Sequence, residues 1–261
     1  MKCIKNEAAC VCYDEGIGLD DTIKKLCRLV KNYPFIITPF SDIDNDINRV
    51  FAAKGFHLYP TYEKTTVFYD PDTDCFFKII HPLHIKNRIF SLVTDKSRSI
   101  YNLAESLYAK GVKVQRVVAR GTFTKDRLPF YAIKKSEGES LYDLLIGAGK
   151  NISIDMYRKV MDEVAKLHLS GYWFGDAHLS HIFTTDEEVS GFIDIDGIRK
   201  NRPYMLKNLA KDIAGLNHPA LPLTEDEKRA ILNYYLHSLD ITEEERFLEM
   251  LKYYTERRWK D

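Results

Sequence analysis

The spacing of hydrophobic residues changes near residue 138, and this change limits what the chain can fold into. From 56 to 134, aromatic and β-branched residues form short runs separated by turn formers, as in the stretch 70–74. Beyond 140, apolar residues recur at helical spacing. The sequence therefore predicts an α+β protein, with a small antiparallel-sheet lobe that carries one helix and a larger, mostly helical lobe.

The two lobes are expected at 56–138 and 139–261, after an N-terminal extension of unknown role at 1–55. Five strands and one helix are predicted in the sheet lobe, and the helix ends at Gly111. The strands are expected at 56–62, 65–69, 75–80, 112–119 and 129–134, and the helix at 95–110. In the second lobe, helices are expected at 140–146, 153–170, 204–216, 224–239 and 242–257, with Thr224 and Thr242 as caps of the last two.

Composition limits the partners of the chain. Its 38 basic and 38 acidic residues give a net charge of zero, so we expect no nucleic-acid partner, and we interpret the basic residues at 252–260 as a solvated helix end. The number of cysteines is odd, which predicts free thiols in a reducing compartment; they are Cys3, Cys10, Cys12, Cys27 and Cys75. Because no long apolar run is present, we expect a cytoplasmic protein with at most peripheral contact with the inner face of a membrane.

Two aspartates, 18 positions apart, carry the strongest chemical signal. Asp176 lies in a loop rich in Gly, Asp and His that follows the long helix 153–170. Asp194 ends an apolar strand, where an unpaired carboxylate is costly. A predicted hairpin of 182–184 and 191–195 brings the two segments together. Phosphoryl transfer needs one carboxylate at the attacking hydroxyl and another that holds Mg²⁺ on the nucleotide, so the pattern favours a kinase.

The segments 175–178 (GDAH) and 193–195 (IDI) resemble the catalytic loop and metal motif of the protein-kinase-like superfamily. They are most similar to those of the bacterial lipopolysaccharide core kinases, the Kdo/WaaP family and its heptose-kinase relatives. The similarity covers about residues 56–216. It implies a bilobal protein-kinase-like fold and an enzyme that transfers phosphate from ATP, with Mg²⁺, to an alcohol group.

The resemblance also implies roles for single residues. Asp176 is the expected catalytic base, and Asp194 the expected Mg²⁺ ligand. Lys78, in a strand, matches the lysine that contacts the nucleotide phosphates. Glu137 occupies the hinge, whose backbone would meet adenine. Asp212 matches a helical aspartate that braces the catalytic loop, which is a structural role.

Three positions differ from the family pattern. His181 stands where an asparagine is expected; it is the candidate second metal ligand, although Mg²⁺ prefers oxygen. The turn 60–66 contains no glycine, so Lys64 would have to compensate in binding phosphate. Glu105 is the candidate partner of Lys78, but it lies five residues from the expected position near Ile100.

The leading hypothesis is a kinase for a sugar hydroxyl of the lipopolysaccharide core or a related glycolipid. One alternative is a small-molecule or protein kinase of the aminoglycoside-kinase or RIO type, and another is a pseudokinase that binds a nucleotide or partner without turnover. A metal hydrolase would instead use ligands from a single cluster: His178, His181, Asp194 and Asp196. Neither the acceptor nor the oligomeric state follows from the sequence.

Overall fold

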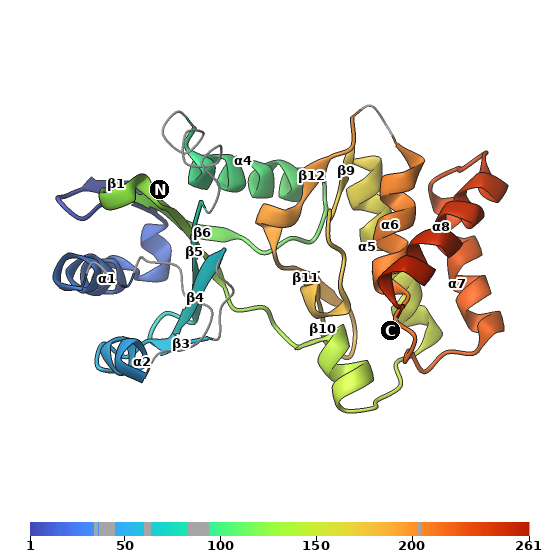
Figure 1. Cartoon of the computed structure of the whole chain (residues 1–261), viewed down its shortest axis with the longest axis horizontal. Helices are drawn as coiled ribbons and strands as arrows, with labels where there is room; N and C mark the ends of the chain where they lie inside the picture. Colours follow the sequence, from blue (N-terminus) through green and yellow to red (C-terminus); the bar gives the residue numbers. More distant parts are fainter. Residues whose placement is uncertain (34–35, 37–44, 60–63, 83–93, 203–204, 261) are drawn as a thin grey trace. The chain divides into compact units, whose positions relative to one another are not determined.

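The computed structural model describes residues 1–33, 36, 45–59, 64–82, 94–202 and 205–260. The chain forms two compact units. The first, called the sheet unit, contains Met1–Glu105 and Arg116–Lys135, and the second, called the helical unit, contains Ser106–Gln115 and Ser136–Asp261. Figure 1 labels the elements of each unit. These elements confirm the predicted α+β class, with an antiparallel sheet in one unit and mostly helices in the other.

Within the described residues, the sheet unit is built on one seven-stranded antiparallel sheet of order β1-β2-β6-β7-β5-β4-β3. Its strands are β1 (Lys2–Lys5), β2 (Ala9–Tyr13), β3 (His57–Leu58), β4 (Thr65–Asp70), β5 (Cys75–Ile80), β6 (Val117–Phe123) and β7 (Pro129–Lys134). β5 lies between β4 and β7, so it is an inner strand of the sheet.

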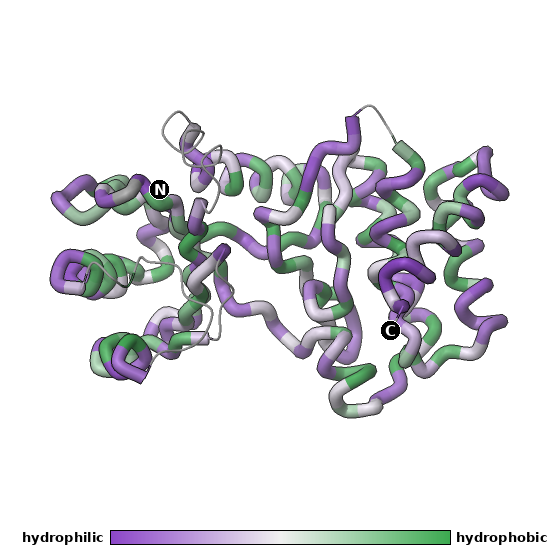
Figure 2. Tube along the Cα trace, in the orientation of Figure 1, coloured by the Kyte–Doolittle hydropathy of each residue, from purple (hydrophilic) through white to green (hydrophobic). Residues whose placement is uncertain are grey.

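One face of this sheet carries the core of the unit. Helices α1 (Asp20–Asn32) and α2 (Asn45–Ala52) contribute buried apolar side chains to it, together with Phe68, Phe77 and Phe130 from the strands. Figure 2 shows hydrophobic and hydrophilic residues alternating along both helices, as expected for helices with one buried face. The rings of Phe68 and Phe77 stack at a centroid distance of 5.0 Å.

The opposite face meets the start of helix α4 (Lys96–Ala109). Arg120 pairs with Cys12 in the strand register, so its side chain points away from the α1–α2 core. Its guanidinium lies 3.6 Å from Asp95 and 5.6 Å from the centre of the Tyr101 ring. The predicted order of strand, helix and strand is therefore present, and the helix covers the second face.

Residues 1–55, expected as a separate extension, contribute two strands to the sheet. β2 pairs with β6, and β1 pairs with β2. This register places Cys3 opposite Cys12, and the two form a disulfide with Cα atoms 4.0 Å apart. The prediction of free thiols is wrong for this pair, because cysteine parity does not reveal strand register, whereas Cys10, Cys27 and Cys75 are free.

Other boundaries also differ from the expected ones. The first predicted strand is reduced to His57–Leu58, and residues 60–62 of that prediction lie outside the described residues, as does most of the turn 60–66. The strand expected from 112 begins at Val117. Helix α8 begins at Glu244 after Glu243, with no side-chain cap, so Thr242 is not its cap.

The helical unit is formed mainly by four helices, α5 (Ile154–Leu169), α6 (Leu206–Leu216), α7 (Glu225–Ser238) and α8 (Glu244–Arg258). Ser153 caps α5 by accepting from the Met156 N–H, and Thr224 forms a capping box with Glu227 on α7. α5 packs on α7, and α6 packs on α8. A π-helical turn (Asp143–Gly147) stands where the short helix was predicted.

Short strands complete this unit. β8 (Glu139–Ser140), β10 (Ile182–Thr184) and β11 (Val189–Phe192) form a three-stranded sheet, and β9 (Tyr172–Trp173) pairs with β12 (Arg199–Lys200). The predicted hairpin is therefore present, but its second strand, β11, begins at Val189, two residues before the expected start at 191. In the part of the chain that the structure describes, no helix has a stretch long and apolar enough to cross a membrane.

His81, at the end of β5, makes the stability of the sheet unit depend on pH. Its ring is buried, with Nε2 2.8 Å from the Thr66 hydroxyl and no partner for Nδ1 among the described residues. Burial lowers its pKa from 6.5 to about 4. Between these values the unfolded chain binds more protons than the folded chain, so stability falls as pH falls from 6.5 to 4.

We expect His81 to account for a loss of about 3 kcal/mol in the free energy of unfolding over this pH window. Urea unfolding of the wild type and of His81→Gln, measured across the window, should show a shallower pH dependence in the variant. His57→Gln replaces an exposed histidine of the same sheet and should retain the wild-type slope. Equal slopes in all three proteins would contradict the assignment.

Candidate active site

A buried carboxylate anchors the segment that precedes Asp176. Asp212, on α6, is 1% exposed, and its Oδ2 accepts a 2.6 Å hydrogen bond from the Phe174 N–H. The same oxygen lies 3.0 Å from Nε2 of His168, whose Nδ1 lies 2.7 Å from the Tyr235 hydroxyl. Three helices, α5, α6 and α7, are thus tied to one point of the loop, which is the bracing role predicted for Asp212.

The electrostatics of this anchor are a balance of opposing effects. Burial raises the pKa of Asp212 above its usual value of 3.8, while the bonds from His168 and from the backbone of Phe174 and Gly175 act in the opposite direction. Removing the carboxylate would leave His168 and the Phe174 N–H unsatisfied in the interior. Each such group costs about 1–3 kcal/mol.

The loop that carries Asp176, residues 175–183, is called the Asp176 loop. It approaches α6 closely at Gly215, where a Cβ atom would lie 2.3 Å from the carbonyl oxygen of Ala177. No side chain fits in that space, although glycine inside a helix costs about 1 kcal/mol relative to alanine. Gly215 therefore lets the loop rest directly on the helix.

The turn that carries Asp194, residues 193–197, is called the Asp194 turn, and it contacts the Asp176 loop. The Ile193 N–H donates to the His181 carbonyl at 3.0 Å. A Cβ atom on Gly175 would lie 2.7 Å from the Gly197 carbonyl oxygen, and Gly175 has φ +80°. The two segments predicted to meet are therefore in backbone contact.

Asp194 itself adopts a left-handed backbone conformation, with φ 62° and ψ 41°. Among residues with a side chain, Asp and Asn tolerate this conformation best. The carboxylate is half-buried, and its Oδ2 lies 2.8 Å from where a Cβ atom of Gly197 would be. Gly197 thus leaves room for the Asp194 carboxylate to fold back over the turn.

Asp176 is exposed and ion-paired. Its side chain is 74% exposed, and Oδ1 accepts a 2.9 Å hydrogen bond from Nη2 of Arg258, near the end of α8. The same nitrogen donates to the carbonyl of Ala177, also at 2.9 Å. A cation from the last helix is therefore attached to the predicted base.

Histidine and tyrosine rings contact one another at the Asp176 loop. Nδ1 of His178 accepts from the Ser180 N–H at 3.2 Å, and its ring lies 5.9 Å from that of His181 and 5.4 Å from that of Tyr142. Burial lowers the pKa of His178 below 6.5, as do the charges of His181 and Arg258, against a smaller raising effect of Asp176. The loop environment therefore disfavours the charged form of His178.

The other predicted site residues divide between the units. Glu137 is exposed in the helical unit, directly after the chain leaves the sheet unit at Lys135. The following residue, Gly138, packs so closely on β10 that a Cβ atom would lie 2.0 Å from the Thr184 carbonyl oxygen. The hinge position is therefore held tightly, while the contact with adenine stays a prediction.

Lys78 and Glu105 belong to the sheet unit. Lys78 is half-buried on β5, opposite Tyr131, in the same row and on the same face of the sheet as Arg120. That face is the one covered by α4. Glu105 is exposed on α4, and no ion pair involving it is found among the described residues. The nucleotide-binding roles of both residues stay predictions.

The chemistry of the donors fits Mg²⁺ better than a transition metal. Among the described residues, no group of three or more His, Cys, Asp or Glu side chains is arranged to hold a metal ion, so the four ligands of the hydrolase alternative are not gathered. Mg²⁺ in nucleotide sites is usually held by one or two carboxylates together with phosphates and water. Asp194 would supply such a carboxylate.

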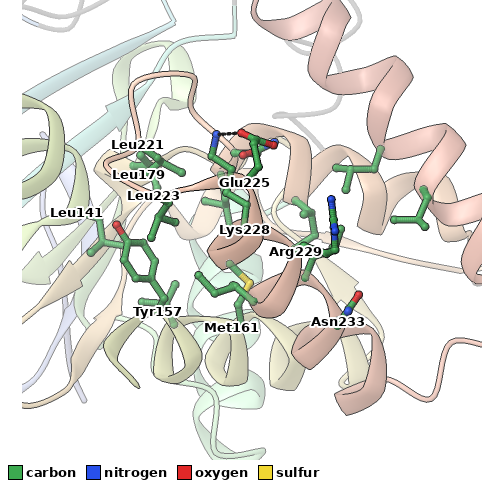
Figure 3. Close-up of a pocket in the computed structure, with 18 residues that line it drawn as sticks. Leu141, Tyr157, Met161, Leu179, Leu221, Leu223, Glu225, Lys228, Arg229 and Asn233 are labelled. Atoms are coloured by element: carbon green, nitrogen blue, oxygen red, sulfur yellow. Dashed lines mark hydrogen bonds and ion pairs between the residues drawn. The ribbon is translucent and has the colours of Figure 1, made fainter. Parts of the chain in front are cut away.

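An apolar pocket of about 400 Å³ lies beside the Asp176 loop within the helical unit. Figure 3 shows Leu179 of that loop with Leu221 and Leu223 on one side and Tyr157 and Met161 across from them. An ion pair of 2.8 Å joins Lys228 to Glu225 at its edge. The pocket contains none of the residues predicted to react.

Sequence reasoning missed Arg258, Gly215, His168 and Tyr235 as parts of this site. Arg258 lies in the basic run at the chain end that was interpreted as a solvated helix end. Asp212 and Gly215 lie three residues apart, on the same side of α6. A glycine inside a helix weakly indicates that another segment of the chain packs closely against the helix there. The His168–Asp212 pair spans 44 positions and has no local signature.

No family model and no curated protein matches the chain. Solved structures with a similar fold include the bifunctional kinase-methyltransferase WbdD, at 13% identity and a TM-score of 0.47, covering 74% of this chain and 47% of that one. A second WbdD structure has 13% identity and a TM-score of 0.49, covering 76% and 50%. An aminoglycoside-3'-phosphotransferase of type VIII has 14% identity and a TM-score of 0.48, covering 77% and 94%.

The chain thus spans about half the length of the WbdD chains that it resembles. The similarity concerns the fold. At these identities and at TM-scores below 0.5, it assigns neither an activity nor a substrate to this chain.

Gly215→Ala tests the docking of the Asp176 loop on α6. Alanine normally stabilises a helix relative to glycine, but here its Cβ would collide with the Ala177 carbonyl. We expect the free energy of unfolding to fall by about 1–3 kcal/mol, as for an overpacked core. Urea unfolding measures it, with Gly147→Ala as the control, because the nearest atom to a Cβ there is 3.9 Å away. A Gly215→Ala variant as stable as Gly147→Ala would refute this packing.

Proposed function

We propose that this chain is an ATP- and Mg²⁺-dependent kinase that phosphorylates a sugar hydroxyl of a lipopolysaccharide core or a related glycolipid. One observation carries the proposal. The buried Asp212 holds Phe174, the residue directly before the Asp176 loop, and that loop in turn contacts the Asp194 turn through backbone atoms of Gly175 and Gly197. Two carboxylates on rigid, touching segments are what phosphoryl transfer requires of the protein.

Each carboxylate has a separate proposed task. Asp176 is exposed, and its partner Arg258 binds Oδ1, so Oδ2 can accept the proton of an acceptor hydroxyl and orient that hydroxyl for attack. Asp194 would hold Mg²⁺, with His181 as the second candidate ligand. When bound, Mg²⁺ neutralises charge on the transferred phosphate. Lys78 is proposed to bind the nucleotide phosphates, with Glu105 as its candidate partner and Glu137 at the hinge.

Aromatic rings near the Asp176 loop suit a sugar acceptor. Half-buried rings of Tyr142 and His218 lie 6.0 Å apart, and His218 lies 4.6 Å from Trp259. Such rings offer apolar faces to the C–H faces of a sugar.

The proposed donor and acceptor also suggest where the enzyme works. ATP is cytoplasmic and a glycolipid is membrane-bound, so we propose a protein that acts at the inner face of a membrane with at most peripheral contact. A pseudokinase would share the folded segments described above, and it differs in the lack of turnover.

Binding of MgATP, followed by thermal shift, is the first test. At 100 times its dissociation constant, a ligand stabilises the folded state by about 2.7 kcal/mol, which corresponds to a shift of roughly 5–10 °C for a chain of this size. We expect this shift to need Mg²⁺ and to be lost in Lys78→Ala and Asp194→Asn. Lys54→Ala and Asp186→Asn change exposed residues of the same types and should retain it. No shift in the well-folded wild type would refute a nucleotide site.

Asp176→Asn separates binding from transfer. The amide cannot accept a proton, so we expect turnover to fall by about 10²–10⁴-fold while the MgATP shift persists. Phosphate release from MgATP, and then transfer to heptose- and Kdo-containing glycans, provides the measurement. Equal turnover in the variant and the wild type would contradict the assignment of Asp176, and MgATP binding without turnover in the wild type would favour a pseudokinase.

A further inference from the structure

The contact between Arg258 and the Asp176 loop is the feature of the helical unit that the proposed function leaves unexplained. Nη2 of Arg258 donates to Oδ1 of Asp176 and to the carbonyl oxygen of Ala177, each at 2.9 Å. We propose that Arg258 is a positioning residue, which holds the Asp176 carboxylate in the orientation that faces the acceptor hydroxyl. The inference rests on the proposed kinase function.

The pair has little value for stability alone. The Asp176 side chain is 74% exposed and that of Arg258 is 30% exposed. Ion pairs this open to solvent typically contribute only about 0–1 kcal/mol, because water screens the charges and ordering two side chains costs entropy. We therefore look for the role of the Arg258–Asp176 ion pair in the orientation of the Asp176 carboxylate rather than in stability.

The geometry fixes the carboxylate against its own loop. Because one nitrogen bridges Oδ1 of Asp176 and the carbonyl of the next residue, the side chain is tied to the backbone beside it. An exposed aspartate without such a bridge samples several side-chain rotamers. With Oδ1 bound to Arg258, we expect Oδ2 to face the acceptor hydroxyl. A base held in one orientation lowers the entropy cost of reaching the reactive geometry.

Arg258 can serve this role because the end of α8 is itself held in place. The indole Nε1 of Trp259 donates to the Ala214 carbonyl on α6 at 2.9 Å, and the guanidinium of Arg258 lies 5.5 Å from the centre of the Trp259 ring. Gly215 leaves room for the guanidinium, since a Cβ atom there would lie 3.3 Å from Cζ of Arg258. The same helix, α6, thus supports both the loop and the arginine that orients it.

A guanidinium suits this bridge better than an ammonium. Its donors are fixed in one plane on a rigid group, whereas lysine offers a mobile point charge. Arg258→Lys therefore retains the charge next to Asp176 but loses the fixed geometry. Arg257, the preceding residue, is exposed. Its substitution by alanine removes the same charge from the helix end as Arg258→Ala does, but it does not remove the hydrogen bonds to the loop.

The test measures the orientation of Asp176 directly and then its consequence. In the full chain with labelled aspartate, NMR couplings between Hα and Hβ of Asp176 report whether the side chain has one rotamer. We expect one rotamer in the wild type and in Arg257→Ala, and averaged couplings in Arg258→Ala. Phosphate release from MgATP, with water as the acceptor, should fall about tenfold in Arg258→Ala and less in Arg258→Lys, a part of what a general base contributes. Added guanidinium ion should restore part of the loss.

The outcomes separate this inference from the proposed function. If the Asp176 side chain keeps one rotamer in Arg258→Ala, the inference is overturned. It is also overturned if the couplings of Asp176 become averaged in this variant but phosphate release is unchanged. A loss of activity shared by Arg257→Ala would indicate a general charge effect and would overturn it as well. Failure of the wild type to bind MgATP in the thermal-shift test refutes the kinase function, and this result does not depend on any variant at 258.

Discussion

The carboxylate of Asp212 is buried among helices, and the order of the whole site depends on it. It accepts from the Phe174 N–H, two residues before Asp176, and from His168, which is held in turn by Tyr235. Burial of a carboxylate is costly unless hydrogen bonds offset the lost hydration, and the bonds from Phe174 and His168 do so at Oδ2. Because these partners come from α5, α7 and the residue directly before the loop, the packing of the helices and the position of the loop are set by the same interaction.

Two glycines allow close backbone packing between α6 and the Asp176 loop, and between that loop and the Asp194 turn. Gly215 admits the Ala177 carbonyl to the surface of α6, and Gly175 admits the carbonyl of Gly197. At both places two backbones approach more closely than any side chain would allow. The relative position of the two aspartates is therefore set by main-chain contacts, which vary less than contacts between flexible side chains.

Much of the architecture could be predicted from the sequence, because it depends on local patterns. The aromatic and β-branched run at 75–80, the helical spacing at 153–170 and the cap Thr224 predicted β5, α5 and α7 correctly. The assignment of 1–55 to a separate extension did not anticipate β1 and β2, since β2 pairs with β6, more than a hundred positions away, and β1 joins the sheet through its register with β2. The Cys3–Cys12 disulfide follows from that register and from no property of either cysteine alone.

The candidate site was predictable to a similar extent. Motif spacing indicated that the segments of Asp176 and Asp194 would meet, and their backbones are in contact. The bracing role of Asp212 came from a resemblance, and its hydrogen bond to Phe174 is present. Arg258 could not be found in this way, because it is 82 positions from Asp176 and one basic residue among several at a helix end. Long-range pairs of charged residues leave no periodic trace in a sequence.

The left-handed conformation of Asp194 has a consequence for how this chain can diverge. A residue at that position must satisfy the backbone as well as the chemistry, and only Asn, Asp and Gly adopt the conformation with little strain. Substitution at this position would therefore be tolerated first as Asn or Gly, while β-branched residues would be excluded by the backbone. The turn would thus keep its outline in homologues whatever chemistry its side chain serves.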